Sequence, residues 1–255
     1  MRLRIVLDNP RTTTIPINYQ DNLTGLMYRL LGTSDADFSR FLHDDGYAVD
    51  DGPKRFKLFT FSWLRGRRAP GGGDLIQFLP GPIEWMVASP VEDFLRHCAT
   101  GLLASSSLRV GTAEFPIVEI ETLPSPALSE TTYFTCLSPI VASVPATDGR
   151  STAYYLRPHE TEAFSAAVRN NLLRKHEVLY GLPPIDDRFD LSFKPDYLAR
   201  GENAGTKKIS YKGIDIVGAF APFKVIGSTE LMRLMLECGA GEKNAGGFGC
   251  VEVME

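Results

Sequence analysis

The sequence is poor in cysteine, and the few cysteines it has are widely spaced. Its 255 residues include Cys98, Cys136, Cys238 and Cys250, separated by 38, 102 and 12 positions. This spacing matches neither the paired ligands of a structural zinc site nor a redox-active dithiol. We therefore expect reduced, mostly buried thiols that behave as small apolar side chains.

Long apolar runs and an excess of positive charge are also missing. The longest apolar runs, such as residues 217–223, are far shorter than the roughly 18 residues that cross a bilayer. At the N-terminus, Asp8 interrupts the chain before a signal-type apolar segment forms. Lys and Arg number 27 against 31 Asp and Glu, for a net charge of -4. We therefore expect a cytoplasmic protein without a membrane partner, in which any nucleic-acid site is a local basic patch.

The length and the order of the expected elements favour two domains. At roughly 100 to 200 residues per domain, 255 residues make one large domain or two small ones. Apolar periodicity predicts strands over 2–7, 55–64, 75–79, 83–88 and 115–121, and helices over 23–31 and 91–103. With one additional strand, this is the β-α-β-β-α-β order of the ferredoxin-like motif.

A similar order follows a proline-punctuated stretch, residues 123–128, where we place a linker. Strands are expected over 133–144, 190–194, 209–226 and 250–254, and helices over 160–176 and 231–237. The predicted fold is therefore α+β, with two tandem ferredoxin-like (RRM-like) β-α-β-β-α-β domains. Their predicted boundaries are residues 1–124 and 128–255.

Charge is segregated between residues 35 and 68. Residues 35–51 contain six acids, whereas residues 54–68 contain six basic residues and no acid. The basic residues are Lys54, Arg55, Lys57, Arg65, Arg67 and Arg68. Four aromatic residues lie between them, so a strand here would present cations to a polyanion while the rings pack beneath or stack on bases. The alternative is a solvated edge strand whose cations block sheet association.

Glycine is concentrated in residues 239–249, at Gly239, Gly241, Gly246, Gly247 and Gly249. Glycine lets backbone amides approach a phosphate closely, and Lys243 adds a cation to the same loop. A dinucleotide fingerprint is excluded because Asn244 stands at its third glycine, and a P-loop because no Gly-Lys-Ser/Thr ends the loop. The alternative is a glycine-rich turn without a ligand.

Two side chains are expected to share an exposed surface. His43 follows Phe41 and Leu42 at the end of a short helix that Ser34 could cap, and it points about 140° from the apolar stripe of that helix. Tyr28 has a similar offset from the stripe of the preceding helix. The alternative for His43 is a solvated side chain without a role. His97, His159 and His176 are expected to be structural.

Five segments together resemble a known family. They are Leu23-Thr-Gly-Leu-Met-Tyr28, Phe41-Leu-His43, Lys57-Leu-Phe-Thr-Phe-Ser62, Leu137-Ser-Pro-Ile140 and the terminal Gly-Ala-Gly-Glu-Lys-Asn-Ala-Gly-Gly-Phe-Gly-Cys-Val251. They resemble the CRISPR-associated endoribonucleases of the RAMP superfamily, which cut repeat RNA into guide RNAs. The resemblance implies two ferredoxin-like domains and a metal-free catalytic set without a cofactor. The roles carry over to Tyr28, His43 and Lys57, with Lys54 as an alternative lysine.

The resemblance also implies a substrate and a reaction. CRISPR repeat RNA would bind to the basic segment and the glycine-rich loop, and the RNA 2′-hydroxyl would attack, leaving a 2′,3′-cyclic phosphate and a 5′-hydroxyl. The protein would act as a monomer or homodimer, alone or with other CRISPR-associated effector subunits. Two alternatives stay open. One is a non-catalytic RNA-binding subunit of a CRISPR complex, and the weaker one is a regulatory module that binds phosphate.

Overall fold

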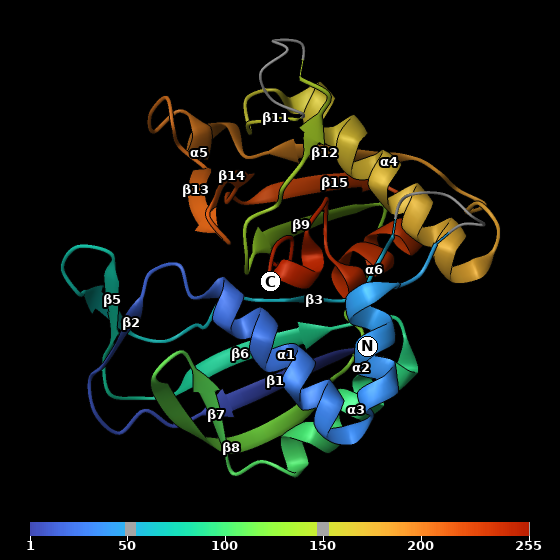
Figure 1. The fold of residues 1–255 in the computed structure, drawn as a ribbon. Coiled ribbons are helices and arrows are strands. Elements are labelled where there is room, and N and C mark those ends of the chain that lie inside the picture. The colour runs from blue at the N-terminus through green and yellow to red at the C-terminus, as the bar shows by residue number, and fades with distance from the viewer. Residues whose placement is uncertain (49–54, 147–152, 255) are drawn as a thin grey trace.

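The chain forms two halves, each built on an antiparallel sheet (Figure 1). The structure is a computed structural model that describes residues 1–48, 55–146 and 153–254. The first half contains β1 (Arg2–Leu7), β2 (Thr13–Pro16), α1 (Gln20–Ser34), α2 (Ala36–Asp44), β3 (Thr60–Phe61), β4 (Arg68–Pro70), β5 (Leu75–Phe78), β6 (Ile83–Ala88), α3 (Glu92–Leu103), β7 (Ser107–Val110) and β8 (Ala113–Leu123).

The second half follows the expected linker. It contains β9 (Thr131–Cys136), β10 (Ser143–Val144), β11 (Tyr154–Tyr155), α4 (Thr161–Tyr180), β12 (Phe189–Phe193), α5 (Pro195–Leu198), β13 (Thr206–Tyr211), β14 (Ile214–Ala219), β15 (Phe223–Gly227), α6 (Thr229–Cys238), the 3-10 turn η1 (Asn244–Gly246) and β16 (Val251–Val253). None of the helices among the described residues is both long and apolar enough to span a membrane.

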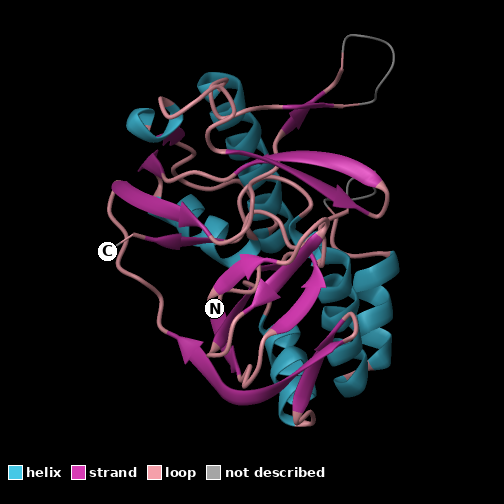
Figure 2. Ribbon diagram, turned by 90° about the vertical axis from the view of Figure 1, so that its left-hand side faces the viewer, coloured by secondary structure: helices cyan, strands magenta, loops and turns pink. Residues whose placement is uncertain are grey.

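The first sheet has the order β3-β6-β1-β8-β7, with β1 in its centre. Alternate residues of β1, from Leu3 through Ile5 to Leu7, are buried, as the strand pattern predicts. The helices α1, α2 and α3 cover one face of this sheet (Figure 1). Figure 2 shows the same arrangement from the side, with the strands of the first half on one side and its helices on the other. The predicted stripe of α1 is confirmed, because Leu23, Leu26, Met27, Leu30 and Leu31 are all buried.

The second sheet has the order β12-β15-β9-β16. Each β-α-β-β-α-β unit contributes four main strands to its sheet. In both sheets these strands lie side by side in the same order, with the second strand of the unit at the edge, followed by the third, the first and the fourth. Each half also has its own apolar core. In the sequence, the buried residues of the first core end at Phe115 and those of the second begin at Phe134. The predicted order of elements is therefore present in both halves, and it is consistent with two ferredoxin-like units.

Several predicted elements differ in the structure. The expected strand 55–64 is reduced to Thr60–Phe61, because Leu58 has a positive φ of 52° that interrupts an extended chain. The strand β5 leaves the main sheet and pairs with β2 and β4 in a separate one. The cap of α2 is Asp35 rather than Ser34, since its carboxylate accepts a hydrogen bond from the amide of Phe38.

The two halves meet at β3 and the glycine-rich loop. The Thr60 hydroxyl donates to the Phe248 carbonyl at 3.0 Å, and the Trp63 amide donates to the Leu137 carbonyl at 3.1 Å. Trp63 also stacks on Phe220, with ring centroids 5.4 Å apart. The segment that follows Lys57 is therefore anchored in both halves.

Candidate active site

Tyr28 and His43 lie together on the helix side of the first half. Their ring centroids are 5.2 Å apart, with the rings nearly perpendicular. Tyr28 comes from α1 and His43 from the last turn of α2, and the two helices pack against each other. The His43 side chain is 65% exposed, as its offset from the apolar stripe predicts. The predicted shared surface is therefore present.

The environment of His43 orients its imidazole. Its Nδ1 lies 2.7 Å from Oδ1 of Asp44, so the carboxylate accepts a hydrogen bond from Nδ1–H. Among the polar contacts of the described residues, none involves Nε2 of His43. The arrangement suits an imidazole that takes up or gives a proton through Nε2.

Tyr28 is chemically a donor at neutral pH. Burial raises the pKa of Tyr28 to about 12, and neighbouring Tyr211 and Asp44 act in the same direction. The phenol consequently keeps its proton over the physiological range. It can donate a hydrogen bond or a proton to an oxygen that gains negative charge, but it is poorly suited to remove one.

Lys57 joins this pair. Its Nζ donates a hydrogen bond to the His43 carbonyl at 2.9 Å, which places the ammonium beside the end of α2. Burial lowers the pKa of Lys57, whereas Asp44 and Asp45 favour its charged form. The structure thus brings together the three side chains expected from the resemblance. The alternative lysine, Lys54, lies outside the described residues.

A basic cleft of about 630 Å³ begins at Lys57. It lies between the segment that leads to β3, the β13–β14 hairpin and the glycine-rich loop. Among the residues that the structure describes, its lining includes five cations, Arg55, Lys57, Lys175, Lys212 and Lys243, but a single acid, Glu242. This cleft is therefore a local basic patch in a chain of net charge -4, which is the kind of site that the composition requires for nucleic-acid binding.

The glycines of the loop are buried against the protein itself. A Cβ at Gly241 would lie 2.2 Å from the Val141 carbonyl oxygen, and one at Gly249 would lie 2.0 Å from that of Ala240. At Gly239 and Gly247 the nearest atoms belong to Asn244 and Phe61. The need for glycine there arises from close packing and positive φ. This packing gives the glycines a reason that involves no phosphate, and the expected reason, that side chains would keep phosphates from the amides, stays a prediction. RNA binding by the loop stays a prediction, with Lys243 as its exposed cation.

Lys175 of α4, which the sequence pattern did not single out, organises this loop. Its Nζ is buried and donates to the carbonyl oxygens of Gly239 at 2.7 Å and Gly241 at 3.0 Å, and to Oδ1 of Asn244 at 2.7 Å. Asn244 in turn donates to two other carbonyls of the loop. The sequence contains one indication of this role, because Lys175 lies three residues after Leu172 and therefore on the apolar face of the helix.

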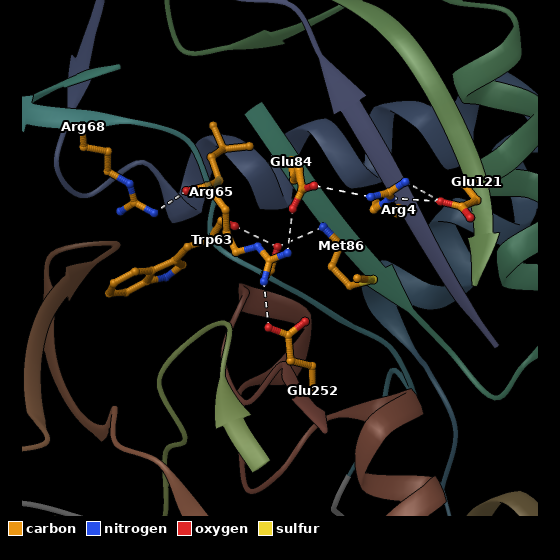
Figure 3. A network of polar contacts seen from close by, with 10 residues as sticks. Arg4, Trp63, Arg65, Arg68, Glu84, Met86, Glu121 and Glu252 are labelled. Atoms are coloured by element: carbon orange, nitrogen blue, oxygen red, sulfur yellow. Dashed lines mark hydrogen bonds and ion pairs between the residues drawn. The ribbon is translucent and has the colours of Figure 1, made fainter. Parts of the chain in front are cut away.

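Arg65 does not lie in the basic cleft. It forms ion pairs with Glu84 of β6 at 2.6 Å and Glu252 of β16 at 2.8 Å, so it connects the two halves (Figure 3). The nearby Arg4 pairs with Glu84 and Glu121 in the same network. With two carboxylates on its guanidinium, Arg65 has a structural explanation that the basic-segment pattern did not anticipate.

Arg67 and Arg68 are exposed but also lie apart from the cleft lining. Arg68 begins β4, donates to the Leu64 carbonyl and lies over the Phe78 ring at 5.5 Å from its centroid. Of the four aromatic rings, Phe59 and Phe61 are fully buried, so these two pack beneath the surface, which is one of the two expected arrangements. The basic segment is therefore divided, with Arg55 and Lys57 at the cleft and the other described cations elsewhere.

The cysteines and two of the remaining histidines lie where the sequence predicts them. All four cysteines are free and buried, as expected. His97 and His176 are buried, and each forms hydrogen bonds within the protein, which supports structural roles. Over residues 1–48, 55–146 and 153–254, no group of three or more His, Cys, Asp or Glu side chains is arranged to hold a metal ion.

Comparison with known proteins identifies the family. The model for the C-terminal part of CRISPR associated protein Cas6 matches residues 123–253, and the model for an N-terminal part of Cas6 matches residues 14–121. The chain belongs to the Cas6 family. It is 30% identical to the CRISPR-associated endoribonuclease Cas6 1 of Methanocaldococcus jannaschii, over 100% of this chain and 93% of that protein. It is 29% identical to the endoribonuclease Cas6 of Pyrococcus furiosus, over 96% of this chain and 86% of that protein.

Solved structures show the same fold. A CRISPR associated protein Cas6 superposes with a TM-score of 0.77 at 29% identity, covering 100% of this chain and 99% of that one. A Cas6-related protein from Pyrococcus furiosus has a TM-score of 0.83 at 24% identity, covering 100% and 98%. A RAMP protein that binds different RNA substrates has a TM-score of 0.81 at 24% identity over the whole of both chains.

Proposed function

We propose that this protein is an endoribonuclease that cleaves CRISPR repeat RNA in precursor transcripts and so produces guide RNAs. Its relatives in Methanocaldococcus jannaschii and Pyrococcus furiosus are named as endoribonucleases. The observation that carries the proposal is the convergence of Tyr28, His43 and Lys57 from three segments at the edge of a basic cleft. The two halves, residues 1–124 and 128–255, would act as tandem ferredoxin-like domains that hold the RNA between them.

The proposed reaction uses the RNA 2′-hydroxyl as nucleophile and no metal. His43 Nε2 takes the proton of this hydroxyl as O2′ bonds to phosphorus. The bond from phosphorus to O5′ breaks, and the Tyr28 hydroxyl gives the departing O5′ a proton. The Lys57 ammonium offsets the negative charge that builds up on the phosphorane oxygens. The products are a 2′,3′-cyclic phosphate and a 5′-hydroxyl.

Residue environments support this division of roles. The raised pKa of Tyr28, about 12, disfavours it as the base, whereas the His43–Asp44 hydrogen bond leaves Nε2 to accept a proton. Arg55, Lys212 and Lys243 would contact RNA phosphates along the cleft. Arg67 and Arg68, which lie elsewhere, would contact only RNA that extends beyond the cleft.

The test of this function is incubation of the purified protein with repeat RNA, with the ends of the products mapped. We expect cleavage at one phosphate, and we expect it to persist in excess EDTA. A single 2′-deoxy nucleotide just before the scissile phosphate should abolish cutting and leave binding nearly intact. Binding without cleavage would instead identify a non-catalytic RNA-binding subunit. Cleavage of the deoxy substrate, or activity that EDTA removes and Mg²⁺ restores, would contradict the proposed chemistry.

The alkaline pH dependence provides a separate test of Lys57. Because burial lowers the pKa of Lys57, its charge is lost at a lower pH than for an ordinary lysine of pKa 10.5, and the cleavage rate should fall with it. Tyr28, with a pKa of about 12, keeps its proton between pH 7 and 10. Lys57→Arg keeps its charge at high pH, so the decline should move to higher pH. Single-turnover rates between pH 7 and 10, corrected for uncatalysed hydrolysis, check this. Identical alkaline profiles for the two proteins would remove Lys57 from the chemistry.

A further inference from the structure

A second tyrosine, Tyr211, lies where the β13–β14 hairpin meets α1. It is the last residue of β13, is half-buried, and lines the basic cleft. Its hydroxyl is 3.2 Å from Oγ1 of Thr24. Lys212, next in the hairpin, forms an ion pair with Asp21 at 3.6 Å, so two neighbouring hairpin residues contact one turn of α1. The hairpin belongs to the second half and α1 to the first, so these contacts cross the boundary between them.

The direction of the hydrogen bond follows from Thr24. The Thr24 hydroxyl has one hydrogen, which it donates to the Gln20 carbonyl at 3.0 Å within the helix. Thr24 Oγ1 therefore accepts from the Tyr211 hydroxyl. Thr24 is buried, so this contact is shielded from water and favours a single position of α1 against the hairpin.

The other side of Tyr211 is fixed by the glycine-rich loop. Its ring meets Phe248 edge to face at 5.7 Å between centroids. A Cβ at Gly246 would lie 3.1 Å from both Cζ and the hydroxyl oxygen of Tyr211, so glycine at this position makes room for the phenol. Tyr211 thus touches the loop and α1 at once, from the wall of the cleft.

This position matters because Thr24 precedes Tyr28 by four residues. Residues four apart lie on the same face of a helix, so the Tyr211 contact is one turn from the Tyr28 side chain. Tyr211 is also close enough to Tyr28 to raise the pKa of its phenol. The Tyr28–His43 pair belongs to the first half, whereas the hairpin and the glycine-rich loop on the cleft wall belong to the second, and Tyr211 links them at the site.

We propose that Tyr211 is a positioning residue of the site, whose hydrogen bond to Thr24 sets Tyr28 on α1 relative to RNA held in the cleft. This rests on the proposed endoribonuclease activity. Tyr211 keeps the Tyr28 hydroxyl, the proton donor to the leaving O5′, aligned with a scissile phosphate bound in the cleft. Misplacement of a reacting group slows a reaction without weakening substrate binding when the binding groups are other residues, and the cations proposed to hold the RNA are other residues of the cleft.

The test uses Tyr211→Phe, which keeps the ring and removes the hydroxyl, and Thr24→Val, which removes its acceptor. Each should lower the single-turnover cleavage rate at saturating protein about 10-fold, with the RNA Kd unchanged within 2-fold. The double variant should be no slower than the slower single one. Tyr155→Phe is the matched control, because Tyr155 packs in the same apolar cluster, and its rate should equal that of the parent protein.

A second comparison separates positioning from a general structural effect. If Tyr211 acts through Tyr28, then Tyr211→Phe should cause no further loss in a Tyr28→Phe background. An equal loss in both backgrounds, or a Tyr211→Phe rate within 2-fold of the parent protein, would overturn the inference and leave the proposed function standing. A parent protein that binds repeat RNA but does not cut it would overturn the proposed function, and the role of Tyr211 with it.

Discussion

Replacement of His43 by alanine is expected to lower the single-turnover cleavage rate by about 100-fold or more, the usual size of a general acid-base contribution. The affinity for repeat RNA should change little, because His43 lies outside the basic cleft, whose cations are proposed to hold the RNA. Folding should also be unaffected, since the imidazole is 65% exposed and its only polar contact among the described residues is with Asp44. The measurement is the rate at saturating protein, together with a binding isotherm.

His159→Ala is the matched control for this experiment. His159 is also exposed, but it lies next to Pro158 at the start of α4, in the other half of the chain. Its replacement should leave the rate unchanged. A His43→Ala protein that cleaves at the parent rate would remove His43 from the chemistry. A rate loss with an equal loss of RNA affinity would show that His43 acts in binding instead.

The sequence was sufficient to predict the Tyr28–His43 surface because both residues lie on helices. A helix has a fixed angular repeat, so a residue that follows an apolar pair must point away from the buried face. The apolar stripes of α1 and α2 are therefore enough to locate both side chains. The same regularity predicted the central strands, whose two-residue period is visible in β1.

The segment after Lys57 was harder to predict because its regularity is broken locally. The positive φ of Leu58 breaks the two-residue period between Lys57 and Phe59, and the rings of Phe59 and Phe61 lie in the core while Lys57 lines the cleft. The partners of Arg65 come from β6 and β16, which are 19 and 187 residues away. Ion pairs between such distant segments depend on the tertiary fold, and a basic run in the sequence cannot reveal them.

The glycine-rich loop shows a related limit. Its composition correctly indicated unusual backbone geometry, since four of its five glycines, all but Gly246, have positive φ. Composition could not show which atoms approach those glycines, and the atoms prove to be backbone carbonyls, a side-chain amide and a ring of the protein. The role of Lys175 could not be predicted for the same reason, because its acceptors lie at least 63 residues further along the chain.

The buried ammonium of Lys175 leads to the second large expected effect. Four acceptors surround it: the carbonyls of Gly239 and Gly241 and the amide oxygen of Asn244 at 2.7 to 3.0 Å, and the Cys238 carbonyl at 3.4 Å. An ammonium group has three hydrogens, so each of the three closest acceptors receives one. Burial lowers the pKa of Lys175, but this set of acceptors favours the charged form. The three oxygens would have no donor after replacement by an apolar side chain of similar length.

Lys175→Met is therefore expected to reduce the free energy of unfolding by about 2 to 4 kcal/mol, because buried acceptors without donors cost about 1 to 3 kcal/mol each and the cation no longer needs desolvation. The melting temperature should fall by on the order of 10 °C. RNA affinity should fall as well, since the loop that carries Lys243 loses its anchor in α4. Chemical denaturation and a binding isotherm at low temperature check both effects. Arg174→Met, one residue earlier on the exposed face of α4, is the control and should change neither. A Lys175→Met protein as stable as the parent would show that the loop is held by its glycine packing alone.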